Sequence, residues 1–474
     1  MKKWIAAMLL TCLVLCQFAL AEVTLYETRA NGQLMREEYR DENGNLAIGE
    51  QGFAAHRMEY DAQGNAILES YYDENNELMA NAEGIMTITR EYDDQGRAIL
   101  ERYFGADGEG MFYEPIDAYG RRIGYDEDGK ENRIILLDAE GNRMNGSDGW
   151  CEHTIVFDGK RKIQERYLDA DGRPALYKGN YSGIDRVYNE KGKVIRETFY
   201  DITGNVGPNK SGVIIDEKDY DENGKTSEIR YYDASGEPVQ VSSGAYRICY
   251  VYDENGNANN EILLDADGNR INGVNGWCEH STTYDENKNK IAEFYLDADG
   301  RPALYKDSYS GIERVYNEAG LVVRETFYDL SGEIGPNEDG VIIDEKEYDE
   351  NGKVHLIRYF DASNQPMLME SIGAYALERE YDEAGNTILA ARRDGNGALM
   401  VGKDGWAVAT YVFDEQKHKL SEQYYGADRR PITMDKGYAA ITREYNENGD
   451  VILETYTDSD GKLVKRVITE YPEN

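Results

Sequence analysis

The stretch Ala440–Asp458, AITREYNENGDVILETYTD, decides the fold of this 474-residue chain. Its centre is the turn sequence Asn-Glu-Asn-Gly. In the strand before this turn, one face carries Ile441, Arg443 and Tyr445 and the other face carries the residues between them, and the same alternation resumes after the turn. A period of two in β-branched and aromatic residues around a turn is typical of a β-hairpin. An Asx residue before Gly favours a tight turn whose last residue has a positive φ, often with a glycine bulge.

The hairpin pattern repeats along the chain. An aromatic residue followed by Asp or Asn recurs every 31–33 residues, from Tyr60-Asp61 to Tyr445-Asn446, and a second Asx–Gly turn follows, as in Asp169–Gly172. One such unit cannot bury a face alone, so stability must come from contacts between neighbours. We predict an all-β fold: an elongated array of about fourteen 32-residue β-hairpin repeats, either a solenoid or an extended meander sheet. We call the aromatic residues that precede Asp or Asn at this spacing the anchors, and we expect them to stack from unit to unit.

One continuous array is expected over residues 22–474, because no linker or change of composition divides them. Within it, residues 134–252 and 261–381 match closely, which indicates that four units were duplicated together. For example, Gly149–His153 (GWCEH) recurs as Gly276–His280. We expect the units to be equivalent, with no private pocket anywhere along the row.

Residues 1–21 have the pattern of a signal peptide. Two lysines precede a short apolar stretch, and Ala19–Ala21 supplies the small residues needed for cleavage after Ala21. The alternative is an uncleaved N-terminal anchor. We expect a protein that is secreted or held at the cell surface, with no membrane span after leader cleavage, because no later apolar run reaches the length of a span.

The composition is strongly acidic, with 91 Asp and Glu against 52 Lys and Arg and a formal charge of −39. Nucleic acids and anionic membranes bind basic surfaces, so neither is an expected partner. The negative charge would keep many exposed strands soluble and apart. Beyond the leader, Cys151, Cys249 and Cys278 are too few for a disulfide framework, and we expect small buried apolar residues.

The turns resemble those of known repeat classes. Tyr60–Asn65 (YDAQGN) and Tyr92–Arg97 (YDDQGR) resemble the YD repeats of RHS-type proteins, and the short hairpins are similar to MORN-like repeats. Tyr231–Gly236 (YYDASG) is more loosely similar to cell-wall and glucan-binding hairpin repeats. The resemblance implies a β-hairpin repeat architecture and does not carry over a toxin-enclosing shell. The third likeness implies sugar binding, and the leader indicates a protein exported from a bacterium.

Recurrent aromatic residues are the candidate binding residues. Three tryptophans follow a glycine, and three tyrosines occupy matching places in other units. They could form platforms for sugar rings, or they could pack the joints between units. These residues are Trp150, Trp277, Trp406, Tyr181, Tyr309 and Tyr438.

No metal, cofactor or catalytic site is predicted. Cys151 with His153, and Cys278 with His280, offer two ligands each, four units apart, which is too few for zinc. The Asp-rich turns place their glycine fourth, whereas an EF-hand loop has it sixth; weak calcium binding along them is an alternative. The sequence has no glycine-rich phosphate loop and no G-x-S-x-G elbow, so an enzyme is not expected.

These observations predict a non-catalytic exported repeat scaffold that mediates protein or cell-envelope interaction through a long acidic β surface. The partner would be an unknown protein or a cell-wall polysaccharide. One alternative is a carbohydrate-binding repeat protein that recognises the cell wall or a glucan. A further alternative is a surface protein stabilised by divalent cations.

Overall fold

The computed structural model describes residues 24–30, 32–105 and 107–469. The predicted signal peptide, residues 1–21, lies outside the described residues. The described chain is all-β apart from one short 3-10 helix, η1 (Glu114–Ile116). Within these residues, no helix has both the length and the apolar character needed to cross a membrane.

The chain forms two compact units. Unit one runs to Lys218 and includes Tyr231–Glu237, and unit two comprises Asp219–Arg230 and the chain from Pro238 onward. The strands of unit one are β1 (Thr24–Ala30), β2 (Gln33–Arg40), β3 (Ala55–Tyr60), β4 (Ala66–Tyr72), β5 (Thr87–Tyr92), β6 (Ala98–Phe104), β7 (Gly120–Tyr125), β8 (Glu131–Leu137), β9 (Glu152–Asp158), β10 (Arg161–Leu168), β11 (Gly183–Tyr188) and β12 (Val194–Tyr200). The residues of β13 (Ile215–Tyr220) and β14 (Thr226–Tyr232) are divided between the units. The strands of unit two are β15 (Arg247–Tyr252), β16 (Ala258–Leu264), β17 (Glu279–Tyr284), β18 (Lys290–Leu296), β19 (Gly311–Tyr316), β20 (Val322–Tyr328), β21 (Ile343–Tyr348), β22 (Val354–Phe360), β23 (Ala376–Tyr381), β24 (Thr387–Arg393), β25 (Val408–Phe413), β26 (Lys419–Tyr425), β27 (Ala440–Tyr445), β28 (Val451–Thr457) and β29 (Leu463–Ile468).

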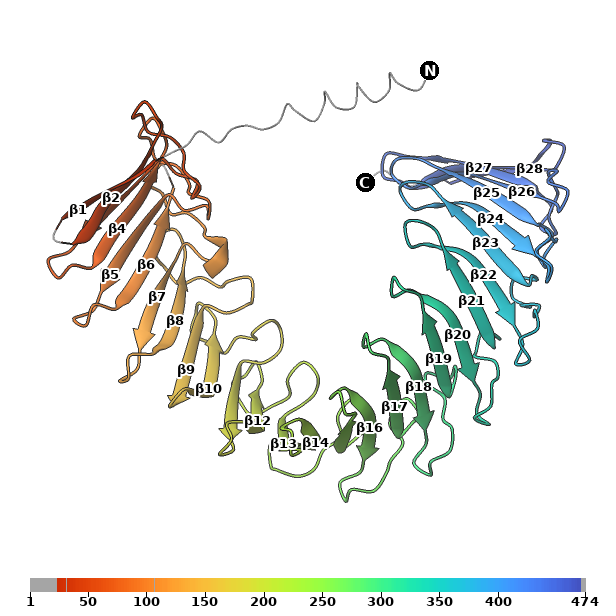
Figure 1. Ribbon diagram of the computed structural model, residues 1–474, viewed down its shortest axis with the longest axis horizontal. Coiled ribbons are helices and arrows are strands. Elements are labelled where there is room, and N and C mark those ends of the chain that lie inside the picture. The colour runs from red at the N-terminus through yellow and green to blue at the C-terminus, as the bar shows by residue number, and fades with distance from the viewer. Residues whose placement is uncertain (1–23, 31, 106, 470–474) are drawn as a thin grey trace. The chain divides into compact units, whose positions relative to one another are not determined.

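Within each unit, consecutive strands pair as an antiparallel meander (Figure 1). The pairing alternates between a long register inside a hairpin and a short register between hairpins. β11 pairs with β12 along its whole length, from Gly183 opposite Tyr200 to Tyr188 opposite Val194. β12 then pairs with β13 only through Arg196–Thr198. Each unit is therefore an elongated, open hairpin meander, and of the two predicted forms the meander sheet is confirmed.

The hairpin turns form as the sequence predicts. A β-bulge shifts the register at Tyr60. Asp61 Oδ1 accepts the backbone N–H groups of Gln63 and Asn65, both at 2.9 Å, and Gly64 has a φ of +92°. The carboxylate satisfies two donors of the turn, and glycine adopts the left-handed conformation without a Cβ clash, so local sequence sets the turn.

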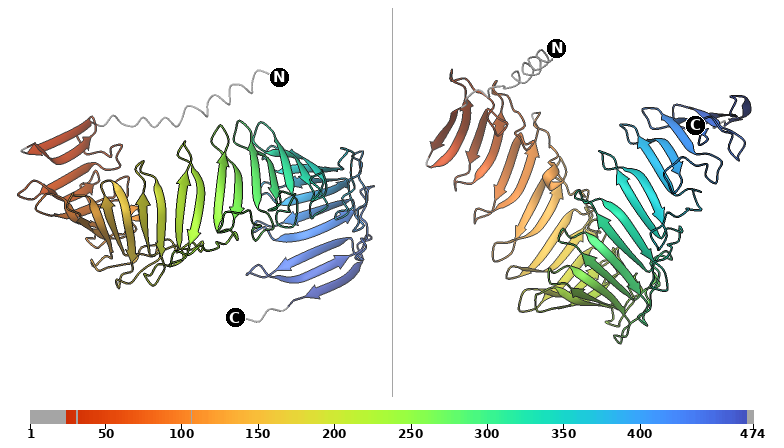
Figure 2. Two further views of the ribbon diagram at one scale, coloured as in Figure 1. Left: turned by 90° about the horizontal axis from the view of Figure 1, so that it is seen from below. Right: turned by 45° about the vertical axis from the view of Figure 1, so that its right-hand side comes forward.

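Longer connections join one hairpin to the next, and each carries further Asx–Gly turns. After β12, Gly204 donates its N–H to Asp201 O at 3.0 Å, and Gly212 donates to Asn209 O at 2.9 Å. Because consecutive strands run in opposite directions, in each unit the short hairpin turns lie at one end of the strands and the longer connections lie at the other end (Figure 2).

The core lies where the connections pack against side chains near the strand ends. Phe53, a connection residue that is 2% exposed, has its ring centroid 5.5 Å from that of Tyr39 on β2 and 5.2 Å from that of Tyr71 on β4. Ile85 from the next connection joins the same cluster, with Tyr103 of β6. Neighbouring hairpins thus share each core cluster, as expected for a repeat protein.

The predicted stacking of one anchor tyrosine on the next is wrong. Equivalent residues of successive hairpins are two strands apart, about 10 Å, which exceeds the range of ring contacts. The anchors bind through their hydroxyl groups instead. Tyr60 donates to Leu34 O at 2.7 Å and Tyr92 to Ala66 O at 2.8 Å, in each case to the preceding hairpin.

Candidate functional site

One face of the sheet carries alternating carboxylates and basic side chains, which we call the charge ladder. Arg186 on β11 lies opposite Glu197 on β12. Its Nη1 is 2.5 Å from Glu165 Oε1 on β10, and its Nε is 3.1 Å from Glu197 Oε1. One guanidinium therefore joins two hairpins. The ladder comprises Glu37, His56, Glu69, Arg90, Glu101, Arg121, His153, Glu165, Arg186, Glu197, Lys218, His280, Glu293, Arg314, Glu325, Lys346, Glu422, Arg443 and Glu454.

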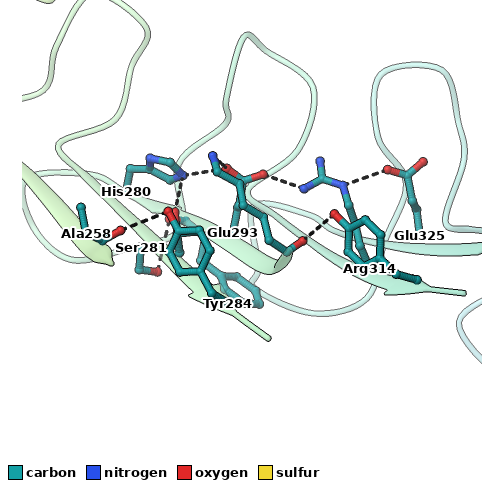
Figure 3. Close-up of polar contacts among 11 residues, drawn as sticks. Ala258, His280, Ser281, Tyr284, Glu293, Arg314 and Glu325 are labelled. Atoms are coloured by element: carbon teal, nitrogen blue, oxygen red, sulfur yellow. Dashed lines mark hydrogen bonds and ion pairs between the residues drawn. The ribbon is translucent and has the colours of Figure 1, made fainter. Parts of the chain in front are cut away.

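The duplicated copy in unit two shows the same geometry (Figure 3). His280 Nε2 lies 3.2 Å from Glu293 Oε2. Arg314 Nη1 lies 2.6 Å from Glu293 Oε1, and its Nε lies 3.1 Å from Glu325 Oε1. The ladder follows from register, because the connection between hairpins places a glutamate of one hairpin beside a cation of the next.

These contacts keep Glu69 and Glu293 ionised. The hydrogen bond with His280, followed by those with Lys290 and Arg314, outweighs burial and holds the pKa of Glu293 well below its usual range. In unit one, the His56 contact is the largest cause that lowers the pKa of Glu69 to about 2. The ladder carboxylates are thus paired with basic side chains on the sheet face.

Exposed negative charge gathers instead at the hairpin turns. The Asx residue is occupied by its own turn: Asp253 Oδ1 accepts the N–H of Asn257 at 2.8 Å. In most hairpins the next residue is an exposed acid, and successive turns are about 10 Å apart. We call these residues the acidic tip row: Asp94, Glu127, Glu190, Glu222, Glu254, Glu286, Glu318, Glu350, Glu383, Glu415 and Glu447.

The structure brings the six predicted aromatic site residues together in pairs. Each pair packs on one intervening tyrosine, which sequence reasoning missed, with ring centroids 5.8–6.3 Å apart. Tyr167 lies between Trp150 and Tyr181, Tyr295 between Trp277 and Tyr309, and Tyr424 between Trp406 and Tyr438. Trp277 is only 9% exposed. This packing is that of joints between hairpins.

The cysteine–histidine pairs face different surroundings. Cys151 is buried, and its Sγ lies 3.5 Å from a backbone carbonyl oxygen, whereas His153 Nε2 lies 3.0 Å from Glu165. Cys278 is buried in the same way. The prediction of buried apolar cysteines is confirmed for these two, but Cys249 is only half-buried. In the described ranges, no three His, Cys, Asp or Glu side chains come together to hold a metal ion.

The charge ladder has several gaps, as where β7 pairs with β8 through apolar residues at the ladder position, and one gap lies between β23 and β26. Arg379 lies opposite Ala390, whereas Arg314 in an intact hairpin lies opposite Glu325. Two residues further along β24, Arg392 occupies the position that is aromatic or leucine in the other hairpins. The missing carboxylate and the missing ring leave a cavity of about 500 Å³, which we call the ladder-break cavity.

The lining of this cavity combines cations with flat apolar walls. No Asp or Glu is among its described lining residues. The lining comprises Arg379, Arg392, Lys419, Asn386, Thr387, Ile372, Leu377, Ala390, Trp406, Tyr411 and Phe413.

The expectation that no unit has a private pocket is therefore wrong. In this region the anchor residues and the turns still follow the repeat pattern. Every unit therefore looks equivalent when only the anchor positions are considered. The deviation lies in the strands, at Ala390 and Arg392. Aligning the strand positions of all hairpins would have revealed it. Of the cavity residues, the sequence-based prediction named Trp406 alone.

No family model matches this chain, and no curated protein matches its sequence. Its fold is similar to solved structures of toxin complexes, at low TM-scores. One is a TcdB2–TccC3–Cdc42 structure, with 14% identity and a TM-score of 0.30 over 94% of this chain and 27% of that chain. Another is the Photorhabdus luminescens Tc holotoxin pore, with 13% identity and a TM-score of 0.23 over 93% of this chain and 22% of that chain. This chain thus spans about a quarter of the length of these structures' chains.

Proposed function

We propose that this chain is a non-catalytic exported repeat scaffold that binds a protein or an envelope polymer through its acidic tip row. The observation that carries the proposal is the recurrence of an exposed acid at the same turn position of successive hairpins. Because the ladder carboxylates are paired with basic side chains, the tips present further, exposed negative charge. A row of like charges about 10 Å apart suits a partner with repeated cationic groups.

The sequence resemblances support the same proposal. The likeness to YD repeats of RHS-type proteins and to MORN-like repeats rests on turn chemistry such as Asp61–Gly64, and that chemistry builds the scaffold. The signal-like pattern of residues 1–21 supports export, to the medium or the cell surface.

Charge reversal tests the acidic tip row. The variant Glu254→Lys, Glu286→Lys, Glu318→Lys is expected to lower retention on the isolated envelope fraction at least about fivefold, because it inverts three consecutive tips. The matched control is Glu59→Lys, Glu91→Lys, Glu380→Lys, which makes the same charge change at exposed residues of the sheet surface. Equal retention of the two variants on the envelope fraction would contradict the proposal.

A carbohydrate-binding protein is the second candidate, and it is favoured by Trp406 alone among the tryptophans. Trp406 lines the ladder-break cavity, whereas Trp277 is 9% exposed and packed against Tyr295. In a pull-down on purified peptidoglycan or glucan, Trp406→Ala is expected to lose binding, and Trp277→Ala, the control, to keep it. Equal binding by both variants would remove this candidate.

A further inference from the structure

We propose that the ladder-break cavity binds a small ring-bearing carboxylate from solution, a role separate from the scaffold function proposed above. The first observation is charge. In a chain with a net charge of −39, three lining side chains are cationic and the described lining holds no acid. Among residues 24–30, 32–105 and 107–469, the Arg379 side chain makes no ion pair or hydrogen bond, although guanidinium groups at its ladder position elsewhere bridge two glutamates, as Arg314 does.

The second observation is that Arg392 is held in place by its neighbours. Its side chain is 5% exposed, its Nη2 lies 3.0 Å from Asp404 Oδ2, and its Cζ lies 3.7 Å from the ring centroid of Trp406. A Cβ at Gly402 would lie 2.6 Å from Arg392 Cδ, so the glycine makes room for the side chain. Arg392 Nε is buried without a hydrogen-bond partner. A buried donor without an acceptor is unfavourable, and a bound carboxylate would supply one.

The third observation concerns the walls. Trp406, Tyr411 and Phe413 offer flat aromatic surface, and Leu377 and Ile372 add aliphatic surface. Pockets that bind small molecules are of this size and combine apolar walls with a few placed polar groups. A guanidinium recognises a carboxylate through two parallel N–H donors. The cavity therefore suits a ring with an apolar face and a carboxylate at its edge.

Two sources share this chemistry, namely the uronic acids of polysaccharides and free aromatic acids. Isothermal titration of the full chain with galacturonate and with 4-hydroxybenzoate separates them. At least one acid is expected to bind at least about tenfold more tightly than its neutral analogue, galactose or 4-hydroxybenzyl alcohol, and more tightly than inorganic phosphate. If neither acid binds at about 10 mM, or if phosphate or a neutral analogue binds as tightly, the proposal is overturned.

The repeat itself supplies the decisive variant. Ala390→Glu restores the carboxylate that intact hairpins carry, so it should pair with Arg379, raise the melting temperature and weaken acid binding at least about tenfold. Arg379→Gln should weaken binding while the fold persists, because Arg379 has no ion pair to lose. Arg358→Gln, with the same charge change outside the cavity, is the control and should bind as the unmodified chain does. Unchanged binding by Ala390→Glu, or weakened binding by Arg358→Gln, would contradict the assignment.

Discussion

At the scale of single residues, backbone conformation explains the glycine of the hairpin turns. Gly320 has a φ of +77°, and nothing lies within 4 Å of the place that a Cβ would take. At the same turn position of the preceding hairpin, Lys288 has a φ of +65°. The left-handed conformation costs a residue with a side chain about 1–2 kcal/mol, so glycine is selected by conformation rather than by crowding.

Exchanging these two residue types tests whether backbone conformation selects glycine at this turn position. Gly320→Ala is expected to lower the free energy of unfolding by about 1 kcal/mol. Lys288→Gly is expected to raise it, because relief of the left-handed strain exceeds the backbone entropy that glycine loses on folding, about 0.5–1 kcal/mol. Chemical denaturation measures both changes. Changes of the same sign in the two variants would contradict this explanation.

A buried aspartate gives the ladder region a pH dependence. Burial raises the pKa of Asp216 to about 6, although Lys218 Nζ lies 3.4 Å from its Oδ1. The folded state therefore holds this proton more tightly than the unfolded state. The contribution of Asp216 to stability is full below about pH 4 and is lost as the pH rises through 6.

Asp216→Asn is accordingly expected to stabilise the protein at pH 7.5, by about 3 kcal/mol, and not at pH 4. Lys218 keeps Glu197 as its ion-pair partner in the variant. Thermal unfolding at the two pH values measures the effect. Asp344→Asn in the duplicated copy should behave in the same way, because burial also raises the pKa of Asp344. A pH-independent difference from the unmodified protein would refute the assignment.

At the scale of the strand and hairpin, the anchor hydroxyl clamps each hairpin to the one before it. Tyr92→Phe removes the hydrogen bond to Ala66 O and is expected to cost about 1 kcal/mol of stability. Tyr72→Phe is the control: within the described chain its hydroxyl makes no hydrogen bond, and Arg57 stacks on its ring 4.1 Å from the centroid. Chemical denaturation should separate the two variants, and equal losses would argue against the clamp.

The strands and turns could be predicted from sequence because their determinants are local. Alternation marked the strands around Tyr445-Asn446, and Asp61 with Gly64 specifies its turn within a few residues. The pairing between hairpins depends on the length and packing of the connections. The contacts of Arg186 with Glu165 and Glu197 therefore could not be read from one hairpin alone.

In the candidate site, too, only the features set by local sequence could be predicted. Trp406 was visible because it recurs after glycine with Trp150 and Trp277, but recurrence marks packing positions as readily as binding positions. The cavity depends on what is absent, namely a carboxylate at Ala390 and a ring at Arg392. Such an absence is defined only relative to the other hairpins, after register has placed equivalent residues on one face.

At the scale of the whole molecule, each hairpin is stabilised mainly by its immediate neighbours. Core clusters, anchor hydroxyls and ladder guanidinium groups all join adjacent hairpins, as Arg314 joins Glu293 to Glu325. Repeat proteins stabilised in this way unfold locally. A disruption at one end of the array therefore leaves the other end folded.

Hydrogen exchange on the full chain carrying Thr326→Pro measures how far stabilisation extends from one hairpin to the next. Thr326 lies in β20 opposite Glu313 of β19 and Ile343 of β21, so proline disrupts two pairings at once. We expect amide protection to be lost in β19–β21, to decline over the adjoining hairpins and to stay unchanged in β3–β6. A uniform loss of protection along the described chain would contradict this expectation.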